Sequence, residues 1–509
     1  MRDQVERQLR YAVDNVNIPE LKGKDAGGKE KFYRGKVRDG YTLDGNERLL
    51  VSTDRISAFD HVLGTIPYKG AVLNSIAAHF LQKATDVFPN AFREVVGANA
   101  MIQDDLEILP VEAIVRAYVA GSAARDYFDR KMRKKCGIDL SAYLLEGRRN
   151  ERFTELLFTP STKAEHGHDE DITEEQILKQ CLMTKEQLNA VKFGSLKVFK
   201  LGEKLAAEHG LILVDTKFEY GLDANGNVKM CDEVLTPDSS RYWIAESYTS
   251  RYACLRDPDD LSKEFLRQAL IERIAKKVGT DEKSIGGMLD TLPRDVFVSV
   301  IDDELRADVA MRYLHLYKQL TGNELALEVG DPRERLYVDL KKSGKIKGYF
   351  VPIIAGSASD DEHVKKITWE LAKRGIPHEH RVCSAHRDPV RLVEEVMSHY
   401  EDSIEPVVYV TVAALSNGLS STVAGNTGWP VIACPPGPKA EKPYSVNDIW
   451  STIRTPPGVP PMAVLEPANV GAAVQRMFGL FDAEMRRASV VEIETNRRKG
   501  AEADKDRRN

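Results

Sequence analysis

Residues 211–241 read LILVDTKFEYGLDANGNVKMCDEVLTPDSSR. Two apolar runs, 211–214 and 228–231, flank the dipeptide Asn225-Gly226, which is the preferred sequence of a tight hairpin turn. The spacing therefore predicts an antiparallel hairpin. Strand-like and helical patterns alternate irregularly around it, so residues 1–320 are predicted to form a mixed α+β domain.

Charged residues lie on both arms of this hairpin. Side chains alternate along a strand, so Asp215, Lys217 and Glu219 are expected on one face, with Asp232 and Glu233 on the returning arm. Carboxylates from adjacent strands repel one another unless a cation joins them, and Mg²⁺ with a bound nucleotide suits oxygen ligands of this kind. The alternative is an exposed polar face with Lys217 as counter-ion.

Two weaker signals lie elsewhere in the first 320 residues. Gly35-Lys36-Val37-Arg38-Asp39 places a glycine and cations between strand-like stretches, where a backbone can approach phosphates, although it is not a P-loop and a plain surface turn is the alternative. Arg116 and Ser122 in VRAYVAGS, with Arg241 in TPDSSR, supply groups that suit phosphate.

The pattern changes after residue 320. Residues 321–347 are polar and predict a linker, whereas 348–490 alternate short apolar strands with helices, which indicates a doubly wound parallel sheet. Residues 491–509 form a charged tail, and its last part, from Asn496, has almost no apolar content and is expected to be frayed.

Polar motifs follow the first two strands of this second domain. Gly356-Ser357-Ala358-Ser359-Asp360 opens a helix and suits an anion, although a plain helix cap is the alternative. Ser384-Ala385-His386-Arg387 follows the next strand. Ligands bind at the carboxyl ends of parallel strands, histidine exchanges protons near neutral pH, and arginine binds phosphate. His386 is therefore a catalytic candidate.

The first domain resembles a known family. Its ordered blocks are GKVRD (35–39), STDRISAFD (52–60), IPYKG (66–70), VRAYVAGS (115–122), FTPSTKAEHGHDE (158–170), DTKFEYG (215–221) and DEVLTPDSSRYW (232–243). In this order they resemble the succinocarboxamide ribotide synthetases of purine synthesis, which have a protein-kinase-like fold and use ATP and Mg²⁺ to join L-aspartate to a carboxyaminoimidazole ribotide (CAIR).

The resemblance implies a role for each matched residue. Gly35, Lys36 and Arg38 would bind ATP, and Glu219 and Asp232 would hold the metal. Asp215 and Lys217 would meet the substrate's carboxylate, where an acyl phosphate forms, and Arg116, Ser122 and Arg241 would bind the ribose phosphate.

One segment departs from the family. The family commonly has a DKQ-type segment before an Arg-Asp pair, whereas Ser250–Leu255 here lacks it and Arg256-Asp257 fits the pair. His166 and His168 are less suited to a metal, since no cysteine is near and a Mg²⁺-type site is expected.

The second domain resembles the aminoimidazole ribotide carboxylases. To the two motifs above it adds Ser416-Asn417-Gly418-Leu419, GNTGWPVIACPP (425–436) and the segment 450–461. The motif at 416–419 is similar to the branch that uses CO₂ directly rather than an N-carboxylated substrate. Leu415 stands where those enzymes tend to carry arginine, and Ser420-Ser421 replaces a Gly-Pro pair.

This second resemblance implies carboxylation of aminoimidazole ribotide (AIR) to CAIR without ATP, biotin or metal. His386 would remove the ring proton. Phosphate and ribose would be bound by Ser357, Asp360, Ser384 and Arg387. The CO₂ pocket would be shaped by Ser416, Asn417 and Gly418. It also implies a homo-oligomer, with an octamer built by the carboxylase domains.

Together the two halves predict consecutive steps in one chain. The net charge of −6 gives no sign of nucleic-acid binding, no stretch is apolar enough for a membrane helix, the N-terminus lacks a signal peptide, and six scattered cysteines favour a reducing cytoplasm. Two rivals remain open. In one, the first half is a small-molecule kinase or another ATP-dependent ligase. In the other, the second half is a non-catalytic assembly or nucleotide-sensing module.

Overall fold

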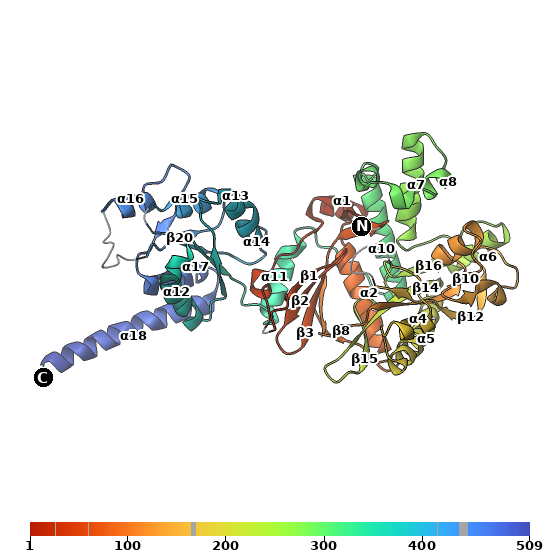
Figure 1. Ribbon diagram of the computed structural model, residues 1–509, viewed down its shortest axis with the longest axis horizontal. Coiled ribbons are helices and arrows are strands. Elements are labelled where there is room, and N and C mark those ends of the chain that lie inside the picture. Colours follow the sequence, from red (N-terminus) through yellow and green to blue (C-terminus); the bar gives the residue numbers. More distant parts are fainter. Residues whose placement is uncertain (26, 60, 164–168, 415, 437–445, 509) are drawn as a thin grey trace. The chain divides into compact units, whose positions relative to one another are not determined.

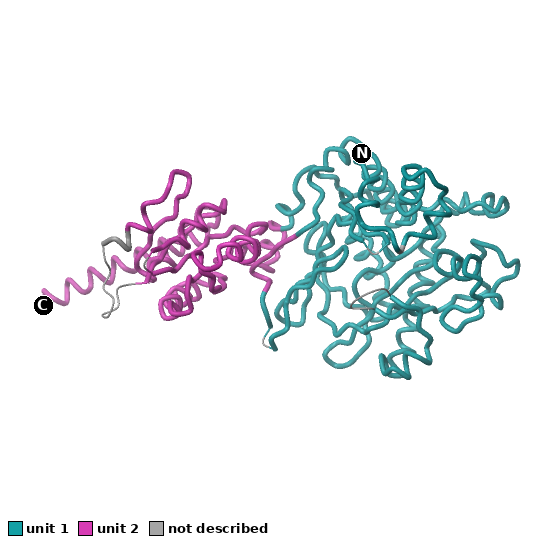
Figure 2. The backbone as a smooth tube through the Cα atoms, turned by 45° about the horizontal axis from the view of Figure 1, so that its top comes forward, with its two compact units in different colours: residues 1–15, 23–336 teal, residues 16–22, 337–509 magenta. Residues whose placement is uncertain are grey.

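The computed structural model describes residues 1–25, 27–59, 61–163, 169–414, 416–436 and 446–508. The chain divides into two compact units (Figure 2). Unit 1 comprises Met1–Asn15 and Gly23–Leu336, and unit 2 comprises Val16–Lys22 and Tyr337–Asn509. The division falls inside the predicted linker, part of which forms the helix α11 (Pro332–Lys342), and the short segment 16–22 belongs to unit 2.

Unit 1 is the predicted α+β domain, with two larger antiparallel sheets. The first has the order β1-β2-β3-β7-β6, and the second the order β12-β9-β14-β15 with β13, β16 and β8 attached. The strands are β1 (Phe32–Arg34), β2 (Arg38–Leu43), β3 (Glu47–Ser52), β4 (Arg55–Ala58), β5 (His61–Thr65), β6 (Phe92–Gly97), β7 (Ala100–Asp104), β8 (Glu107–Ile108), β9 (Val111–Tyr118), β10 (Lys134–Lys135), β11 (Ile138–Asp139), β12 (Arg152–Phe158), β13 (Ser161–Thr162), β14 (Leu211–Leu222), β15 (Val228–Cys231) and β16 (Ser240–Ile244).

The helices of unit 1 pack against these sheets and against one another (Figure 1). They are α1 (Arg2–Gln8), α2 (Lys69–Ala84), α3 (Gly121–Ala124), α4 (Glu174–Lys179), α5 (Lys185–Glu208), α6 (Ala245–Ala253), α7 (Glu264–Val278), α8 (Glu282–Gly286), α9 (Arg294–Val298) and α10 (Asp303–Thr321). The long helix α5 begins at a capping box in which the side chains of Thr184 and Gln187 each accept a backbone N–H. Its apolar face packs against β14, so this strand lies in the core.

The predicted hairpin is confirmed. β14 and β15 pair antiparallel from Glu219 opposite Cys231 to Leu222 opposite Val228, so a loop of residues 223–227 joins them in place of a tight turn at Asn225-Gly226, and Gly226 in this loop has a positive φ of 78°. β14 extends beyond the apolar run 211–214, through the predicted charged positions 215–219, to Leu222, and β8, β9, β15 and β16 all pair with it. In this register Asp215, Lys217 and Glu219 alternate along one strand as predicted.

Unit 2 contains the predicted doubly wound sheet, with five parallel strands in the order β18-β17-β19-β20-β21. The elements are β17 (Val351–Ala355), α12 (Asp361–Lys373), β18 (His378–Val382), α13 (Pro389–Arg391), a π-helical stretch (Leu392–Met397), α14 (Ser398–Glu401), β19 (Tyr409–Val412), α15 (Gly418–Gly425), β20 (Val431–Ala433), α16 (Val446–Ile453), β21 (Met462–Ala463), α17 (Pro467–Phe478) and α18 (Ala483–Arg508). One apolar cluster joins the sheet to α12 and α17, and another joins it to the helices at 389–401 and α15.

The charged tail is helical, which corrects the expectation of a frayed end. α18 continues to Arg508. Its residues from 496 onward are mostly Ala, Glu, Lys and Arg, which favour helix, and Arg498–Glu502 and Arg508–Asp504 form ion pairs one turn apart. The low apolar content at 496–508 therefore marks an exposed helix.

The segment 16–22 is tied into unit 2 by a buried acid pair. The backbone N–H of Glu20 donates to Glu405 at 3.0 Å, and the carboxylate of Glu20 accepts from the N–H of Lys347 at 2.7 Å. Asn17 adds a side-chain bond to the carbonyl of His399 at 2.8 Å. Glu405 is fully buried, and burial together with the Glu20 charge raises its pKa well above the usual range.

This pair predicts a pH-dependent stability of unit 2. The folded state holds the Glu405 proton more tightly than the unfolded state does. The resulting stabilisation of unit 2 is complete below the unfolded pKa of about 4.3, and it is lost as pH rises toward the raised folded pKa. We expect Glu405→Gln to slow hydrogen exchange of the Ile404 amide, which bonds to Asn17, severalfold at pH 8 and not at pH 4. The exposed Glu394→Gln is the matched control, and slower exchange at both pH values would contradict the prediction.

Candidate active site

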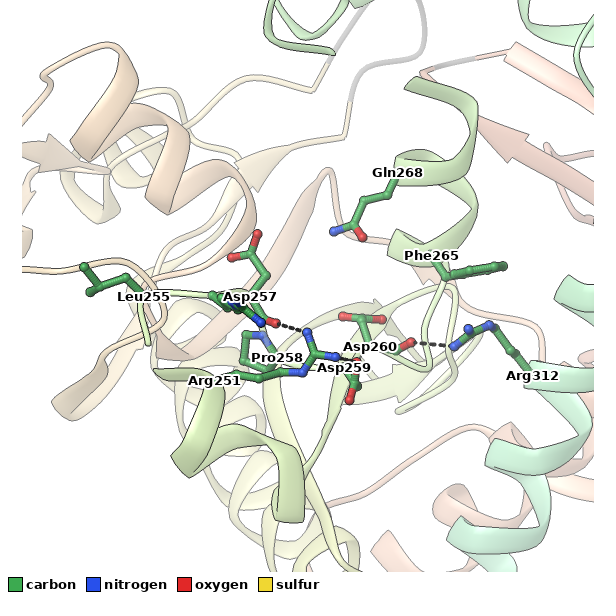
Figure 3. Close-up of a pocket in the computed structure, with 10 residues that line it drawn as sticks. Arg251, Leu255, Asp257, Pro258, Asp259, Asp260, Phe265, Gln268 and Arg312 are labelled. Carbon is green, nitrogen blue, oxygen red and sulfur yellow. Dashed lines mark hydrogen bonds and ion pairs between the residues drawn. The ribbon is translucent and has the colours of Figure 1, made fainter. Parts of the chain in front are cut away.

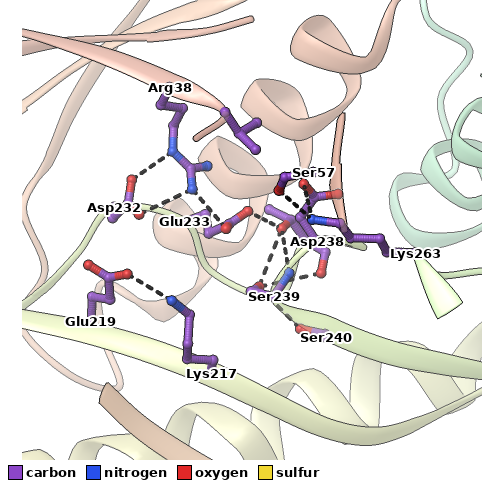
Figure 4. Close-up of polar contacts among 12 residues, drawn as sticks. Arg38, Ser57, Lys217, Glu219, Asp232, Glu233, Asp238, Ser239, Ser240 and Lys263 are labelled. Atoms are coloured by element: carbon purple, nitrogen blue, oxygen red, sulfur yellow. Dashed lines mark hydrogen bonds and ion pairs between the residues drawn. The ribbon is translucent and has the colours of Figure 1, made fainter. Parts of the chain in front are cut away.

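Lys217 is at the centre of the first charged cluster of unit 1. Its ammonium donates to Glu219 at 3.0 Å and also forms an ion pair with Glu112 on the neighbouring strand β9 (Figure 4). Lys163 forms an ion pair with the other oxygen of Glu219. Burial opposes ionisation of Glu219, but Lys217 and Lys163 lower its pKa to about 2. The carboxylate of Glu219 is therefore charged at neutral pH.

The second part of this cluster lies where β15 ends. Arg38 Nε lies 2.7 Å from Asp232 Oδ1, and Arg38 Nη2 lies 2.8 Å from Glu233 Oε1 (Figure 4). Asp232 has a left-handed backbone conformation, with φ of 61°. Strain of this kind in a non-glycine residue is typical of functional sites. Burial and the charges of Glu219 and Glu233 raise the pKa of Asp232 despite Arg38.

The cluster has more carboxylates than cations. The four carboxylates of Glu112, Glu219, Asp232 and Glu233 face the three cations Arg38, Lys163 and Lys217. No group of three or more His, Cys, Asp and Glu side chains among the described residues is arranged to hold a metal. Mg²⁺, however, is usually held by one or two carboxylates together with phosphate oxygens and water. Glu219 and Asp232 fit that chemistry.

The turn at Gly35 and Lys36 is held by a buried arginine. Arg55 donates to the carbonyls of Gly35 at 3.0 Å and Lys36 at 3.2 Å, and it pairs with Asp39 at 2.7 Å. The side chains of Arg55 and Asp39 are 3% and 0% exposed. Gly35 is required by space, since a Cβ there would lie 2.8 Å from the carbonyl of Arg38. The exposed Lys36 is thus presented on a fixed backbone.

The phosphate candidates form a second cluster on the same sheet. Asp215 lies directly opposite Arg116 on β9 and Arg241 on β16, and its Oδ2 accepts from both, at 2.9 Å and 2.6 Å. Arg116 also donates to Ser122 Oγ at 3.0 Å and to Thr159 Oγ1 at 2.9 Å. The structure therefore brings Arg116, Ser122 and Arg241 together, with Asp215 between the arginines.

Gly121 shapes this arginine cluster. Its φ is 53°, and a Cβ there would lie 2.4 Å from the guanidinium of Arg241. The guanidinium thus packs against bare backbone at the start of α3. Any side chain at this position would displace Arg241.

Lys263, Glu264 and Arg267 are further charged residues of the site that the sequence analysis did not single out. Glu264 pairs with Arg241 at 3.4 Å and with Arg267 at 3.3 Å. Lys263 Nζ lies 3.5 Å from Asp238 and 3.1 Å from Ser57 Oγ (Figure 4). The only available signal was the block TPDSSR, which contains their partners Asp238 and Arg241.

The departure at Ser250–Leu255 lies beside a cavity. This cavity has a volume of about 480 Å³ and is lined by Arg251, Leu255, Arg256, Asp257, Pro258, Asp259, Asp260, Phe265, Gln268 and Arg312 (Figure 3). Arg251 pairs with Asp259 at 2.6 Å, and Asn150 donates to Asp257 at 2.8 Å. Burial raises the pKa of Asp260, which lines this cavity, to about 6. His166 and His168 lie outside the described residues.

In unit 2 the candidate residues follow the carboxyl ends of three adjacent strands. Ser357 follows β17, Ser384 to Arg387 follow β18, and Ser416 to Gly418 follow β19. His386 and Gly418 lie against each other, because a Cβ on Gly418 would be 2.8 Å from His386 Nε2. His386 and Arg387 are exposed. The sheet thus brings the two predicted motifs to one edge.

Several of the polar candidates in unit 2 form hydrogen bonds with the backbone of their own loops. Ser357 Oγ accepts from the N–H of Ser359 at 3.2 Å and caps the turn that contains the buried Asp360. The N–H of Arg387 bonds to the carbonyl of Ser384 at 3.2 Å. These bonds fix the loops that carry the candidate anion-binding groups.

The side-chain amide of Asn417 forms hydrogen bonds within the protein. Its amide donates to Thr452 Oγ1 at 3.1 Å, and its Oδ1 accepts from the N–H and Oγ of Ser420. Ser420 Oγ also bonds to Thr411 on β19 at 2.8 Å. Ser420, which stands in place of the family's glycine, is thus fully buried and satisfied. Leu415 lies outside the described residues.

Comparison with known proteins identifies both parts. The family model for SAICAR synthetase matches residues 31–283, and the model for AIR carboxylase matches residues 350–499. The chain is 42% identical over 303 residues to the phosphoribosylaminoimidazole-succinocarboxamide synthase of Bacteroides thetaiotaomicron, which covers 59% of this chain and 90% of that relative. It is 38% identical over 319 residues to the same-named enzyme of Cytophaga hutchinsonii, covering 62% of this chain and 96% of the relative.

A solved structure of Treponema denticola PurE is 37% identical, with a TM-score of 0.29, over 31% of this chain and 97% of that one. The chain thus combines a ligase-type and a carboxylase-type domain of purine biosynthesis. It belongs to the SAICAR synthetase family. Within the described residues, no helix is both long and apolar enough to span a membrane.

The buried Arg55–Asp39 pair generates a stability prediction. Arg55→Lys keeps the charge but removes the planar fork that serves Asp39 and two carbonyls, and breaking a buried pair costs about 3–5 kcal/mol. We expect the free energy of unfolding of unit 1, measured in urea, to fall by about 3 kcal/mol. The exposed Arg7→Lys in unit 1 is the control, and a change for Arg55→Lys below about 0.5 kcal/mol would contradict the prediction.

Proposed function

We propose that unit 1 joins CAIR to L-aspartate with ATP, and that unit 2 makes CAIR from AIR and CO₂. The observation that carries the proposal for unit 1 is the arrangement along β14. The arginine cluster at Asp215 and the lysine cluster at Lys217 lie two residues apart on one strand, about 7 Å by strand geometry. That separation suits a ribotide with its phosphate at one cluster and its carboxylate at the other.

Arg116, Arg241 and Ser122 would bind the ribose phosphate. The two guanidiniums converge on one oxygen of Asp215, and a phosphate can offer more acceptor oxygens in charge-assisted bonds. Asp215 would then hold both arginines in position through its ion pairs with them. This role differs from the one implied by the family resemblance, which placed Asp215 at the substrate's carboxylate.

The ATP phosphates would lie over the turn at Gly35 and Lys36. The fixed backbone of this turn can approach phosphate oxygens, Lys36 would neutralise their charge, and Arg38 would hold Asp232 and Glu233 in place. Glu219 and Asp232 would hold Mg²⁺, which when bound supplies charge neutralisation of the phosphates.

The ligation then needs little covalent chemistry from the protein. A carboxylate oxygen of CAIR attacks the γ-phosphorus of ATP, ADP leaves, and an acyl phosphate forms. Lys217 lies where it can neutralise the reacting carboxylate and the phosphoryl oxygens. The amine of aspartate attacks the acyl carbon, and inorganic phosphate leaves with the electron pair of the broken C–O bond.

In unit 2, His386 would act as the proton acceptor. The carbon of the imidazole ring adds to CO₂, and His386 removes the ring proton so that aromaticity returns. Ser357, Asp360, Ser384 and Arg387 would bind the ribotide's phosphate and ribose, and Ser416 and Gly418 would border the CO₂ site beside His386. Asn417 would act by holding this loop through Thr452 and Ser420.

We extend the proposal to assembly and location. Unit 2 exposes large apolar side chains, including Leu480 at 82% and Trp369 at 61%, which supports a homo-oligomer formed through the carboxylase domains, with an octamer as the expected form. All six cysteines are free thiols, which supports a reducing cytoplasmic location.

A two-stage assay tests the reaction sequence. Purified protein is incubated with AIR and bicarbonate, then with ATP, Mg²⁺ and aspartate, and products are followed by mass. We expect wild type to make the succinocarboxamide product, and His386→Asn to make it only when CAIR is supplied. If wild type also needs supplied CAIR, unit 2 is an assembly or sensing module. If CAIR with aspartate releases no ADP, the synthetase assignment fails.

Gly121→Ala tests the phosphate site. The added methyl group would lie 2.4 Å from the guanidinium of Arg241 and would displace it. We expect the KM for CAIR to rise about tenfold, equivalent to about 1.4 kcal/mol, while the KM for ATP changes little. Gly226→Ala is the matched control, since this glycine also has positive φ but no neighbour within 4 Å. Equal KM changes for CAIR and ATP would contradict the assignment.

A further inference from the structure

A buried carboxylate in unit 1 is shared by two lysines. Asp238 Oδ2 accepts from Lys69 Nζ at 2.9 Å and lies 3.5 Å from Lys263 Nζ, and Asp238 Oδ1 accepts from Tyr313 OH at 2.6 Å. The side chain of Lys69 is fully buried and that of Lys263 is 13% exposed. Two ammonium groups thus face one carboxylate, in surroundings where unbalanced charge is costly.

Lys263 is the less well neutralised of the two lysines. Its contact with Asp238 is long, and its shorter contact, at 3.1 Å, is with the uncharged Ser57 Oγ on β4. Lys69 and Tyr313, by contrast, are at ordinary hydrogen-bond distances from Asp238. Lys263 is therefore the less closely paired amine, and it is also the one that retains access to solvent.

Lys263 is linked to both clusters of the proposed active site through its neighbours. Asp238 precedes Ser239, whose carbonyl accepts from the N–H of Lys217 at 2.9 Å. On the other side, Lys263 precedes Glu264, whose carboxylate pairs with Arg241 at 3.4 Å. Figure 4 shows Lys263, Asp238, Ser239 and Lys217 in one view.

We propose that Lys263 is the general base that removes a proton from the ammonium group of the amino acid substrate before this group attacks the acyl phosphate. The proposal rests on the proposed function of unit 1. It is carried by the shared carboxylate, the long Lys263–Asp238 contact and the links of Lys263 to both clusters through Ser239 and Glu264.

The step balances as follows in atoms and charge. The neutral amine of Lys263 takes one proton from the ammonium of aspartate and becomes an ammonium. The freed lone pair forms the C–N bond, the C–O bond to phosphate breaks, and the phosphate leaves with that electron pair. The second nitrogen proton passes to the departing phosphate, and Lys263 returns its proton to solvent. No oxidant or further reactant is needed.

The charges around Lys263 favour its neutral form. Burial, together with the charges of Lys69 on α2 and Arg267 on α7, lowers the pKa of Lys263 to about 8 against the opposing charges of Asp238 and Glu233. The neutral fraction therefore grows as pH rises through about 8, close to the operating range in which a general base is most effective. Aspartate-dependent turnover should show this inflection, and Lys263→Met should remove it.

Two substitutions separate a base from a structural cation. Lys263→Arg keeps a positive charge beside Asp238 but cannot be deprotonated, and Lys263→Met keeps the length of the side chain without the amine. We expect both variants to lose about 100-fold or more in aspartate-dependent ADP release with CAIR, at the lower end of the effect of a general base. The exposed Lys204→Arg on α5 is the control and should match wild type.

Hydroxylamine supplies the decisive comparison. It is unprotonated at neutral pH and traps acyl phosphates as hydroxamates, so it needs no base. With CAIR, ATP and Mg²⁺, we expect both Lys263 variants to form the hydroxamate within about threefold of wild type, although their aspartate reaction falls about 100-fold.

Two results would overturn the inference alone. One is a Lys263→Arg variant that keeps its aspartate activity, and the other is an equal loss with aspartate and hydroxylamine. A wild-type enzyme that forms neither ADP nor hydroxamate from CAIR would overturn the proposed function, and this inference with it.

Discussion

The pairing of charges along β14 is the constraint on which the centre of unit 1 depends. Asp215, Lys217 and Glu219 project from a strand whose neighbours on both sides are buried, so each charge needs a partner. Arg116 and Arg241 pair with Asp215 from both adjacent strands, while Glu112 and Lys163 complete the Lys217–Glu219 cluster. A slip of one residue in register would turn all of these groups to the opposite face.

This constraint explains why the sequence revealed so much of the site. The loop signal Asn225-Gly226 and the alternation of charged with apolar residues determine the hairpin, and hence which side chains share a face. In unit 2 the short apolar strands likewise predict a parallel sheet with His386 and Gly418 at its carboxyl edge. Local sequence patterns were therefore sufficient to predict the position of a candidate residue wherever that position depends only on the strand, or the strand end, that carries the residue.

Local patterns failed where placement depends on distant parts of the chain. Lys263 is positioned by Asp238, Ser57 and, through Asp238, by Lys69, which belong to separate elements with no common spacing in the sequence. The segment 16–22 gave no sign that it belongs to unit 2, because its bond to Glu405 spans 385 positions. The helix at 496–508 was missed for another reason, since charge content alone does not distinguish a frayed tail from an exposed helix.

The charged clusters of unit 1 are largely neutralised by the protein's own side chains, and this has a consequence for binding. An incoming phosphate at Arg116 and Arg241 must compete with Asp215, and a cation at Glu219 must compete with Lys163 and Lys217. Such competition reduces affinity for each isolated group. If phosphate and a metal bind as proposed, both would rearrange ion pairs on one strand, β14. Binding in unit 1 would then proceed by exchange of ion pairs, rather than by the filling of a preformed charged pocket.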